Sequence, residues 1–206
     1  MKHILDIKTA GAPLDRAEKV LIMIHGRGGS AQDILSLASH LHVDDYALVA
    51  PQATHQTWYP YSFMASVEQN EPWLSSALEV VSQTVEKVRK EGIKPENIYF
   101  FGFSQGACLT LEFLARNAQR FGGATAIIGG VIGDKINRDH YKGNFEHTPI
   151  LIATSNPDFH VPVERVYATT NILKEMGADV TEKVYHNFGH SINQEELELA
   201  NTLIFK

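Results

Sequence analysis

The sequence predicts an α/β protein in which a mostly parallel central sheet carries helices on both faces. Short apolar runs alternate with amphipathic helical patterns along the chain, which is typical of a doubly wound sheet. The run from Val20 to Ile24 is apolar without interruption, as expected for a parallel strand that helices cover on both faces. The 206 residues show no repeat and no linker-like shift in composition. We therefore expect a single domain that spans residues 1–206.

Seven segments have the length and composition of strands. The first is short and alternates apolar with polar residues, so we expect it at an edge of the sheet. The others alternate with helices, which predicts parallel neighbours joined by right-handed crossovers. The expected strands are His3–Lys8, Lys19–Ile24, Tyr46–Ala50, Asn97–Phe101, Ala124–Ile128, Pro149–Ala153 and Ala178–Tyr185.

Five segments have helical patterns, four between these strands and one after the last strand. The longest carries apolar residues at alternating intervals of four and three from Leu74 to Val88, and Gly92 is expected to end it. Ser30 is expected to cap the first helix. The segment 52–70 has no such pattern and is expected to be a long irregular loop. The expected helices are Ser30–Leu41, Pro72–Glu91, Ser104–Asn117, Val163–Met176 and Ile192–Ile204.

Composition and charge exclude several classes of function. The net charge is −6 and no Lys/Arg cluster is present, which argues against a nucleic-acid partner. No apolar run is long enough to span a membrane, and the first residues lack the apolar stretch of a signal peptide. The one cysteine, Cys108, cannot form an internal disulfide. We expect a cytoplasmic protein.

Residues 102–106 read Gly-Phe-Ser-Gln-Gly, directly after an apolar strand and directly before a helical pattern. This is a G-x-S-x-G in the strand–turn–helix context that a nucleophile elbow requires. The sharp turn forces a strained backbone at Ser104, and the flanking glycines relieve the crowding. The turn holds the Ser104 hydroxyl open to a substrate carbonyl. A glycine-rich turn with an incidental serine is the alternative interpretation.

A serine hydroxyl needs a base that removes its proton, and histidine is the usual one. His190 lies in Asn187-Phe188-Gly189-His190, between the last strand and the last helix, where Gly189 permits a tight turn. His186 is closer to the strand end and is the weaker candidate. A plain surface-loop histidine remains the alternative for His190.

A carboxylate should orient that histidine, in the chain order serine, acid, histidine. Asp158 follows the strand Pro149–Ala153 and is the candidate acid. Asp134 and Asp139 follow an earlier strand and fit less well, while Asp179 precedes a strand and so lies at the wrong end of the sheet. A helix-capping or turn aspartate is the alternative for Asp158.

The oxyanion of a tetrahedral intermediate needs preorganised donors. We assign one to the backbone N–H of Gln105, at a helix N-terminus. The other is expected from the loop His25-Gly26-Arg27-Gly28-Gly29, where small residues let the backbone approach substrate, and we assign it to the N–H of Arg27. The Arg27 side chain either faces solvent or binds an anionic group of the substrate.

Aromatic residues crowd the loop after the strand Tyr46–Ala50. They either form an apolar wall for an acyl or alcohol group or cover the edge of the sheet. We expect substrate contacts from Gly26, Trp58 and Tyr59. The aromatic residues are Trp58, Tyr59, Tyr61 and Phe63.

Two further patterns point to other chemistry. Cys108 lies one helical turn after Ser104 and is interpreted as a small buried residue rather than a second nucleophile. His186 and His190 have the spacing of helical zinc ligands, but Gly189 and the strand-to-loop context break the helix that this spacing requires. No metal is expected.

Together these motifs resemble the phospholipase/carboxylesterase family of small α/β-hydrolases, relatives of acyl-protein thioesterases. The resemblance implies an α/β-hydrolase fold with minimal or no lid and a cofactor-free esterase or thioesterase. It implies Ser104, Asp158 and His190 as catalytic triad, with Arg27 and Gln105 as oxyanion donors. The matching segments are Ile24–Gly29, Ala50–Ala53, Thr57–Tyr59, Gly102–Ala107 and Asn187–His190.

Two departures from the thioesterase branch narrow the expected substrate. That branch usually has leucine where this chain has Arg27, and it tends to carry Gly-Thr around a Glu-Asp or Gln-Asp pair where this chain has Thr154–Asp158. The departures favour a small-molecule carboxylesterase over protein depalmitoylation. Lysophospholipase or thioesterase activity and a dienelactone-type lactone hydrolase remain alternatives, although dienelactone hydrolases use a cysteine at the position of Ser104. A monomer or homodimer is expected.

Two other classes of protein remain as alternatives. Gly26–Ala31 satisfies the dinucleotide-binding fingerprint G-x-G-x-x-A, but the following strand ends in Ala50-Pro51-Gln52 without the acidic residue that would hold a ribose. A hydrolase-like binding protein that has lost its chemistry would normally show a damaged triad.

Overall fold

The structure is a computed structural model that describes residues 2–206. Its core is one sheet of seven strands in the order β1-β3-β2-β4-β5-β6-β7. Only β1 pairs antiparallel with its neighbour, and the other pairs are parallel. The predicted mostly parallel sheet is therefore confirmed. The strands are β1 (Ile7–Gly11), β2 (Lys19–Ile24), β3 (Tyr46–Pro51), β4 (Ile98–Phe103), β5 (Gly123–Ile127), β6 (Pro149–Asn156) and β7 (Asp179–His186).

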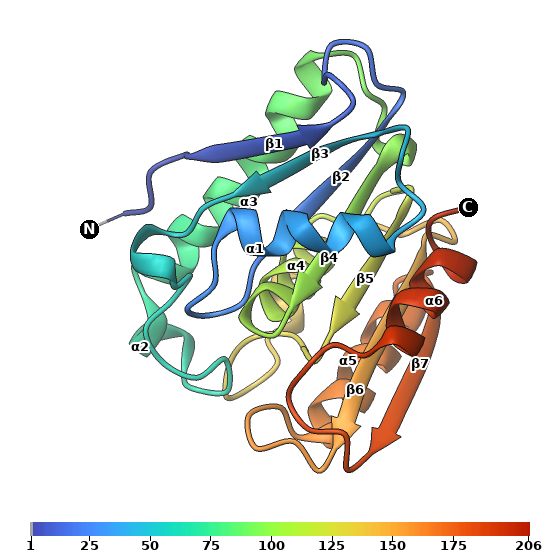
Figure 1. Cartoon of the computed structure of the whole chain (residues 1–206). Helices are drawn as coiled ribbons and strands as arrows, with labels where there is room; N and C mark the ends of the chain where they lie inside the picture. Colours follow the sequence, from blue (N-terminus) through green and yellow to red (C-terminus); the bar gives the residue numbers. More distant parts are fainter. Residues whose placement is uncertain (1) are drawn as a thin grey trace.

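Helices cover both faces of the sheet, with α1 and α6 on one face and α3, α4 and α5 on the other (Figure 1). The residues Val20 to Ile24 of β2 are fully buried between these layers, as the unbroken apolar run predicts. Across residues 2–206, none of the helices combines the length and the apolar character needed to cross a membrane. The helices are α1 (Ala31–Ser36), α2 (Val67–Asn70), α3 (Trp73–Lys90), α4 (Gln105–Arg116), α5 (Val163–Glu175) and α6 (Gln194–Leu203).

The edge strand lies later in the chain than predicted. It was expected at residues 3–8, but β1 begins at Ile7, and the side chains of Ile4 and Leu5 are exposed. His3 is instead buried: its Nε2 lies 2.8 Å from the carbonyl oxygen of Trp58, and its Nδ1 accepts from the N–H of Thr54. An edge strand with exposed faces can form from few apolar residues. The alternation of apolar and polar residues in 3–8 therefore did not mark where the strand lies.

Two other boundaries differ in ways that matter for the site. The strand β6 runs to Asn156, three residues beyond its predicted end, because it pairs with β7 along its whole length. The helix after Ser30 is shorter than predicted, since α1 ends at Ser36 and continues only as a 3₁₀ turn. Ser30 caps α1 in a capping box with Asp33, as its position predicts.

The turn between β4 and α4 brings the chain very close to the end of β2. A Cβ atom added at Gly106 would lie 2.1 Å from the carbonyl oxygen of Ile24 and 2.6 Å from that of His25. A Cβ at Gly102 would lie 2.6 Å from the carbonyl oxygen of Gly106. Both glycines of the motif therefore allow the first turn of α4 to pack directly on backbone atoms, which no larger residue permits.

We expect Gly106→Ala to lower the free energy of unfolding by about 3 kcal/mol, because the new methyl group overlaps two backbone oxygens that cannot move independently. The control is Gly28→Ala, which has a positive φ of 78° but nothing within 4 Å of its new Cβ. Its strain alone should cost about 1 kcal/mol. Urea unfolding of both variants measures the difference, and equal effects would contradict the steric explanation.

Candidate active site

Ser104 joins β4 to α4 in a backbone conformation that serine rarely adopts, with φ 53° and ψ −118°. Its N–H donates to the carbonyl oxygen of Ile127, and its own carbonyl accepts from the N–H of Cys108. These bonds fix the serine between β5 and the first turn of α4. Its Oγ lies 2.7 Å from Nε2 of His190.

His190 lies in the loop between β7 and α6, and the loop is shaped by two residues of positive φ, Asn187 at 53° and Gly189 at 89°. The hydroxyl of Ser155, near the end of β6, accepts hydrogen bonds from the N–H groups of Phe188 and Gly189. The loop is thus attached to the neighbouring strand just before the histidine. The His190 side chain is a quarter exposed, so it remains accessible from solvent.

Asp158 completes a hydrogen-bonded line with these two residues. Its Oδ2 lies 2.8 Å from Nδ1 of His190, and its Oδ1 accepts from the N–H groups of His160 and Val161, each at 2.8 Å. Burial alone would raise the pKa of Asp158, but the bonds from the His160 N–H, the His190 ring and the Val161 N–H outweigh it and lower the pKa below its usual value. The carboxylate is therefore held ionised beside the imidazole.

The other candidate acids and the other candidate base lie elsewhere. Asp134 and Asp139 are exposed. Asp179 is the first residue of β7, at the opposite end of the sheet, where its Oδ1 lies 3.1 Å from Nδ1 of His147. His186 is exposed at the end of β7. The structure brings together only the predicted set of Ser104, Asp158 and His190.

The two N–H groups assigned to an oxyanion hole flank Ser104. The N–H of Gln105 belongs to the first residue of α4, where no helical acceptor exists. Within residues 2–206, no backbone oxygen accepts from the N–H of Arg27. A Cβ added at Gly26 would lie 3.4 Å from Cβ of Ser104, so the loop abuts the serine. Both groups are free to donate to a charge that develops beside the serine.

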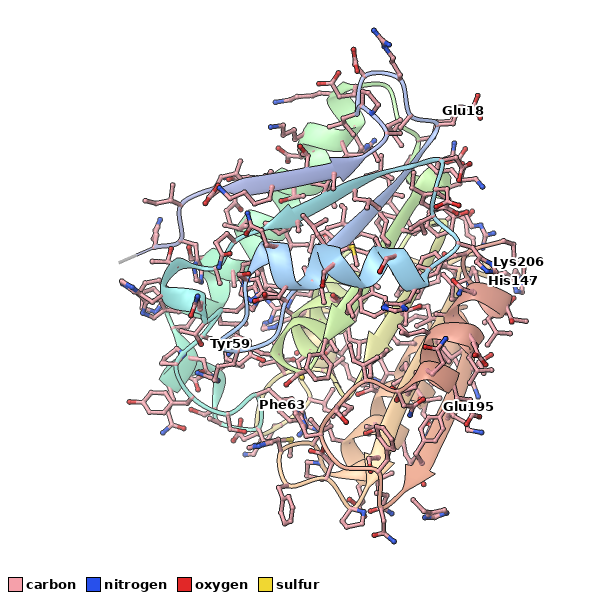
Figure 2. All side chains as sticks on the ribbon, viewed as in Figure 1. Glu18, Tyr59, Phe63, His147, Glu195 and Lys206 are labelled. Atoms are coloured by element: carbon pink, nitrogen blue, oxygen red, sulfur yellow. The ribbon has the colours of Figure 1, made fainter. Side chains whose placement is uncertain are left out.

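A cavity of about 720 Å³ opens over the serine. Tyr59 and Phe63, which are labelled in Figure 2, come from the loop between β3 and α2 and line this cavity. Tyrosine and phenylalanine rings form part of the wall together with polar side chains, and neither aspartate nor glutamate lines it. The lining residues are Arg27, Tyr59, Pro60, Tyr61, Ser62, Phe63, Ser104, Gln105, Cys108, Phe159, His160, Val161 and His190.

The expected substrate contacts of Trp58 and Gly26 need correction, because neither residue lines the cavity. Trp58 is fully buried behind the wall, where its indole N–H donates to the carbonyl oxygen of His25. Gly26 acts through its missing side chain, which lets the loop approach Ser104. Tyr59 lines the cavity as predicted. Of the aromatic residues of this loop, Trp58, Tyr59 and Phe63 are buried and only Tyr61 is exposed.

Cys108 lies in the cavity floor but is buried, and burial raises the pKa of its thiol to about 12. At neutral pH the thiol is therefore protonated and a poor nucleophile. Among residues 2–206, no cluster of three or more His, Cys, Asp or Glu side chains could hold a metal ion.

Sequence reasoning missed two contributors to the site. Ser155 lies in the segment Thr154–Asp158, and its role depends on the extension of β6 to Asn156, which the sequence pattern does not predict. His160 lines the cavity, and its ring packs edge-on against His190 with centroids 4.9 Å apart. Only the position of His160 two residues after the candidate acid could have indicated it.

Comparison with known proteins places this site in a family context. The model of the phospholipase/carboxylesterase family matches residues 6–206. A phospholipase/carboxylesterase from Dyadobacter fermentans has a crystal structure that is 50% identical, covers 100% of this chain and 99% of its own, and superposes with a TM-score of 0.99. The structure of SOBER1 from Arabidopsis thaliana is 23% identical over 92% of this chain and 98% of its own, with a TM-score of 0.77, which shows the shared fold.

Sequence relatives carry two kinds of name. A probable carboxylesterase, SOBER1-like, of Arabidopsis thaliana is 31% identical over 65% of this chain and 51% of its own length. Acyl-protein thioesterase 1 of Saccharomyces cerevisiae is 27% identical over 95% of both chains. The chain spans about half the length of the plant carboxylesterases that it matches.

The lowered pKa of Asp158 predicts a pH-dependent stability. A carboxyl whose pKa falls on folding stabilises the native state above its unfolded value of 3.8, and this stabilisation disappears as the pH falls through the lower folded value. We expect wild type and Asp158→Asn to differ most in free energy of unfolding near neutral pH and to converge as the pH drops below about 4. Urea unfolding between pH 3 and 7 measures this. A difference that is constant with pH would contradict it.

Proposed function

Because the chain belongs to the phospholipase/carboxylesterase family, which has the α/β-hydrolase fold, we propose that it is a serine hydrolase of small carboxylic esters that works through an acyl-enzyme on Ser104. One observation carries the proposal: Ser104, His190 and Asp158 form a continuous hydrogen-bonded line whose serine end faces the cavity. The relatives named carboxylesterase and acyl-protein thioesterase support the same reaction class.

The reaction proceeds in two halves. Nε2 of His190 takes the proton of Ser104 while Oγ bonds to the carbonyl carbon, and the oxyanion accepts from the N–H groups of Gln105 and Arg27. The intermediate then collapses, the ester bond breaks, and the leaving alcohol takes the proton from His190. Water attacks the acyl-enzyme while His190 takes its proton. The bond between the acyl carbon and Oγ then breaks, Oγ takes the proton back from His190, and the carboxylic acid leaves. Asp158 stays ionised throughout and orients the imidazole.

The cavity supports a small, largely neutral ester as substrate. Its wall is partly aromatic, and its only formally charged side chain besides the histidines is Arg27. An acyl or alcohol group that contacts this wall loses apolar surface to the protein, which favours binding by about 25 cal/mol per Å². Esters and thioesters share the attack of Ser104 on the carbonyl carbon and differ in the alcohol or thiol that leaves. The preference between them therefore depends on which leaving group the cavity accommodates.

We expect Ser104→Ala to lower kcat for p-nitrophenyl esters by about 10⁴-fold or more, because no other nucleophile faces the imidazole. Hydrolysis is measured on a series from acetate to palmitate, with Ser39→Ala, an exposed serine on a 3₁₀ turn, as control. The chain-length optimum also gives the size of the acyl pocket. Retained activity in Ser104→Ala, or no turnover of any ester by folded wild type, would contradict the proposal, and the second result would favour a binding protein.

We expect Asp158→Asn to lower kcat by about 10⁴-fold while the protein stays folded, because the amide favours the wrong tautomer of His190. Asp134→Asn removes an exposed carboxylate and is the matched control. Circular dichroism checks the fold of both variants. If Asp134→Asn lost activity instead, the assignment of the acid would be wrong.

A further inference from the structure

The side chain of Arg27 reaches across the cavity rim and binds the backbone of the aromatic loop. Its Nη2 donates to the carbonyl oxygens of Tyr59 at 2.9 Å and Tyr61 at 2.7 Å. Its Nη1 donates to the carbonyl oxygen of Pro60 at 3.0 Å and to the hydroxyl of Thr57 at 2.9 Å. Three consecutive carbonyl groups therefore converge on one guanidinium.

This arrangement needs the cation. Three carbonyl oxygens that point toward one position repel each other, and the planar guanidinium offsets this repulsion with donors in a fixed fork. Both terminal nitrogens are occupied by the loop, so they are not available to bind a substrate carboxylate as well. The side chain is exposed, as one of the two roles open from the sequence predicts, but its guanidinium is bound to the loop rather than to an anion.

Gln105 holds the same loop from the other side. Its Oε1 accepts from the N–H of Trp58 at 2.9 Å, and its Nε2 donates to the carbonyl oxygen of Tyr59 at 2.9 Å. The carbonyl of Tyr59 thus accepts from both Arg27 and Gln105. These are the two residues whose backbone N–H groups flank Ser104. The side chains of the two residues whose N–H groups we assign to the oxyanion hole therefore both bind the backbone of the pocket wall.

We infer that Arg27 is a positioning residue. Its guanidinium binds residues 57–61 and so fixes the cavity wall, to which residues 59–63 contribute, relative to the N–H groups assigned to the oxyanion hole. The position of this wall determines which acyl and alcohol groups fit. This inference rests on the proposed hydrolysis at Ser104. A wall that is free to move leaves a small acetyl group little affected, because such a group reaches the wall least. Larger acyl or alcohol groups reach the wall at Tyr59 and Tyr61, and so their binding depends on the position of the wall.

The variant Arg27→Leu tests the inference, because it removes all four hydrogen bonds and leaves the backbone N–H in place. Arg27→Lys keeps the charge but replaces the planar fork with one flexible ammonium group. Arg89→Leu makes the same change at an exposed arginine of α3 whose side chain has no hydrogen-bond partner within residues 2–206 and is the matched control.

The first measurement is hydrogen exchange of the loop, followed by mass spectrometry of peptides that span residues 57–63. We expect exchange at least about tenfold faster in Arg27→Leu and in Arg27→Lys than in wild type, with no change in Arg89→Leu. This measurement requires no substrate. If no ester were hydrolysed, it would still decide whether Arg27 holds the loop, and only the proposed function would have failed.

The second measurement separates positioning from charge recognition. We expect Arg27→Leu to lower kcat/KM for p-nitrophenyl hexanoate by about 100-fold but for acetate by about tenfold or less, with kcat affected as well as KM. Arg27→Lys should not restore the hexanoate value. Loop exchange that is unchanged in Arg27→Leu would overturn the inference. So would an effect confined to KM for an anionic ester, such as the p-nitrophenyl monoester of succinic acid, that Arg27→Lys reverses.

Discussion

The backbone of Ser104 is held in a conformation that costs about 1–3 kcal/mol, and the rest of the site is arranged around it. The turn persists because Gly102 and Gly106 let α4 pack against backbone atoms, and because residues 105–115 of α4 are buried. The helix cannot relax without opening the core. The serine hydroxyl is therefore presented at a fixed point, from which the positions of His190 and the oxyanion N–H groups follow.

The groups that surround this serine come from loops. In these loops, hydrogen bonds that involve side chains replace the backbone hydrogen bonds of helices and strands. Ser155 holds the loop of His190, and the backbone N–H groups after Asp158 hold the carboxylate. Buried backbone groups outside helices and strands need such partners, since an unpaired donor or acceptor is costly. The same hydrogen bonds that satisfy the loops also orient the reacting groups, so stability and positioning have one physical origin here.

Much of this arrangement could be predicted because it depends on the order of strands. Parallel strands bring their carboxyl ends to one edge of the sheet, so Ser104 after β4 and Asp158 after β6 had to lie near each other. What could not be predicted depends on side-chain direction and on long-range partners. The indole of Trp58 bonds to the carbonyl of His25, while Tyr59 lines the cavity. The start of β1 at Ile7 could not be predicted because its exposed residues leave almost no apolar pattern. Three of the four partners of Arg27 are backbone carbonyl groups, which carry no sequence signal.

The last of these points bears on how such a pocket can change its specificity. Arg27 and Gln105 bind backbone atoms of the loop, apart from the Thr57 hydroxyl, and so their hydrogen bonds do not depend on the rings at positions 59 and 61. The exposed ring of Tyr61 can be exchanged for other side chains while the carbonyl groups keep their places, whereas the ring of Tyr59 is buried and also packs in the core. The frame and the surface that meets substrate are thus separable, even though both belong to one short segment. Changes in the wall can alter which ester is accepted without disturbing the serine, the imidazole or the oxyanion donors.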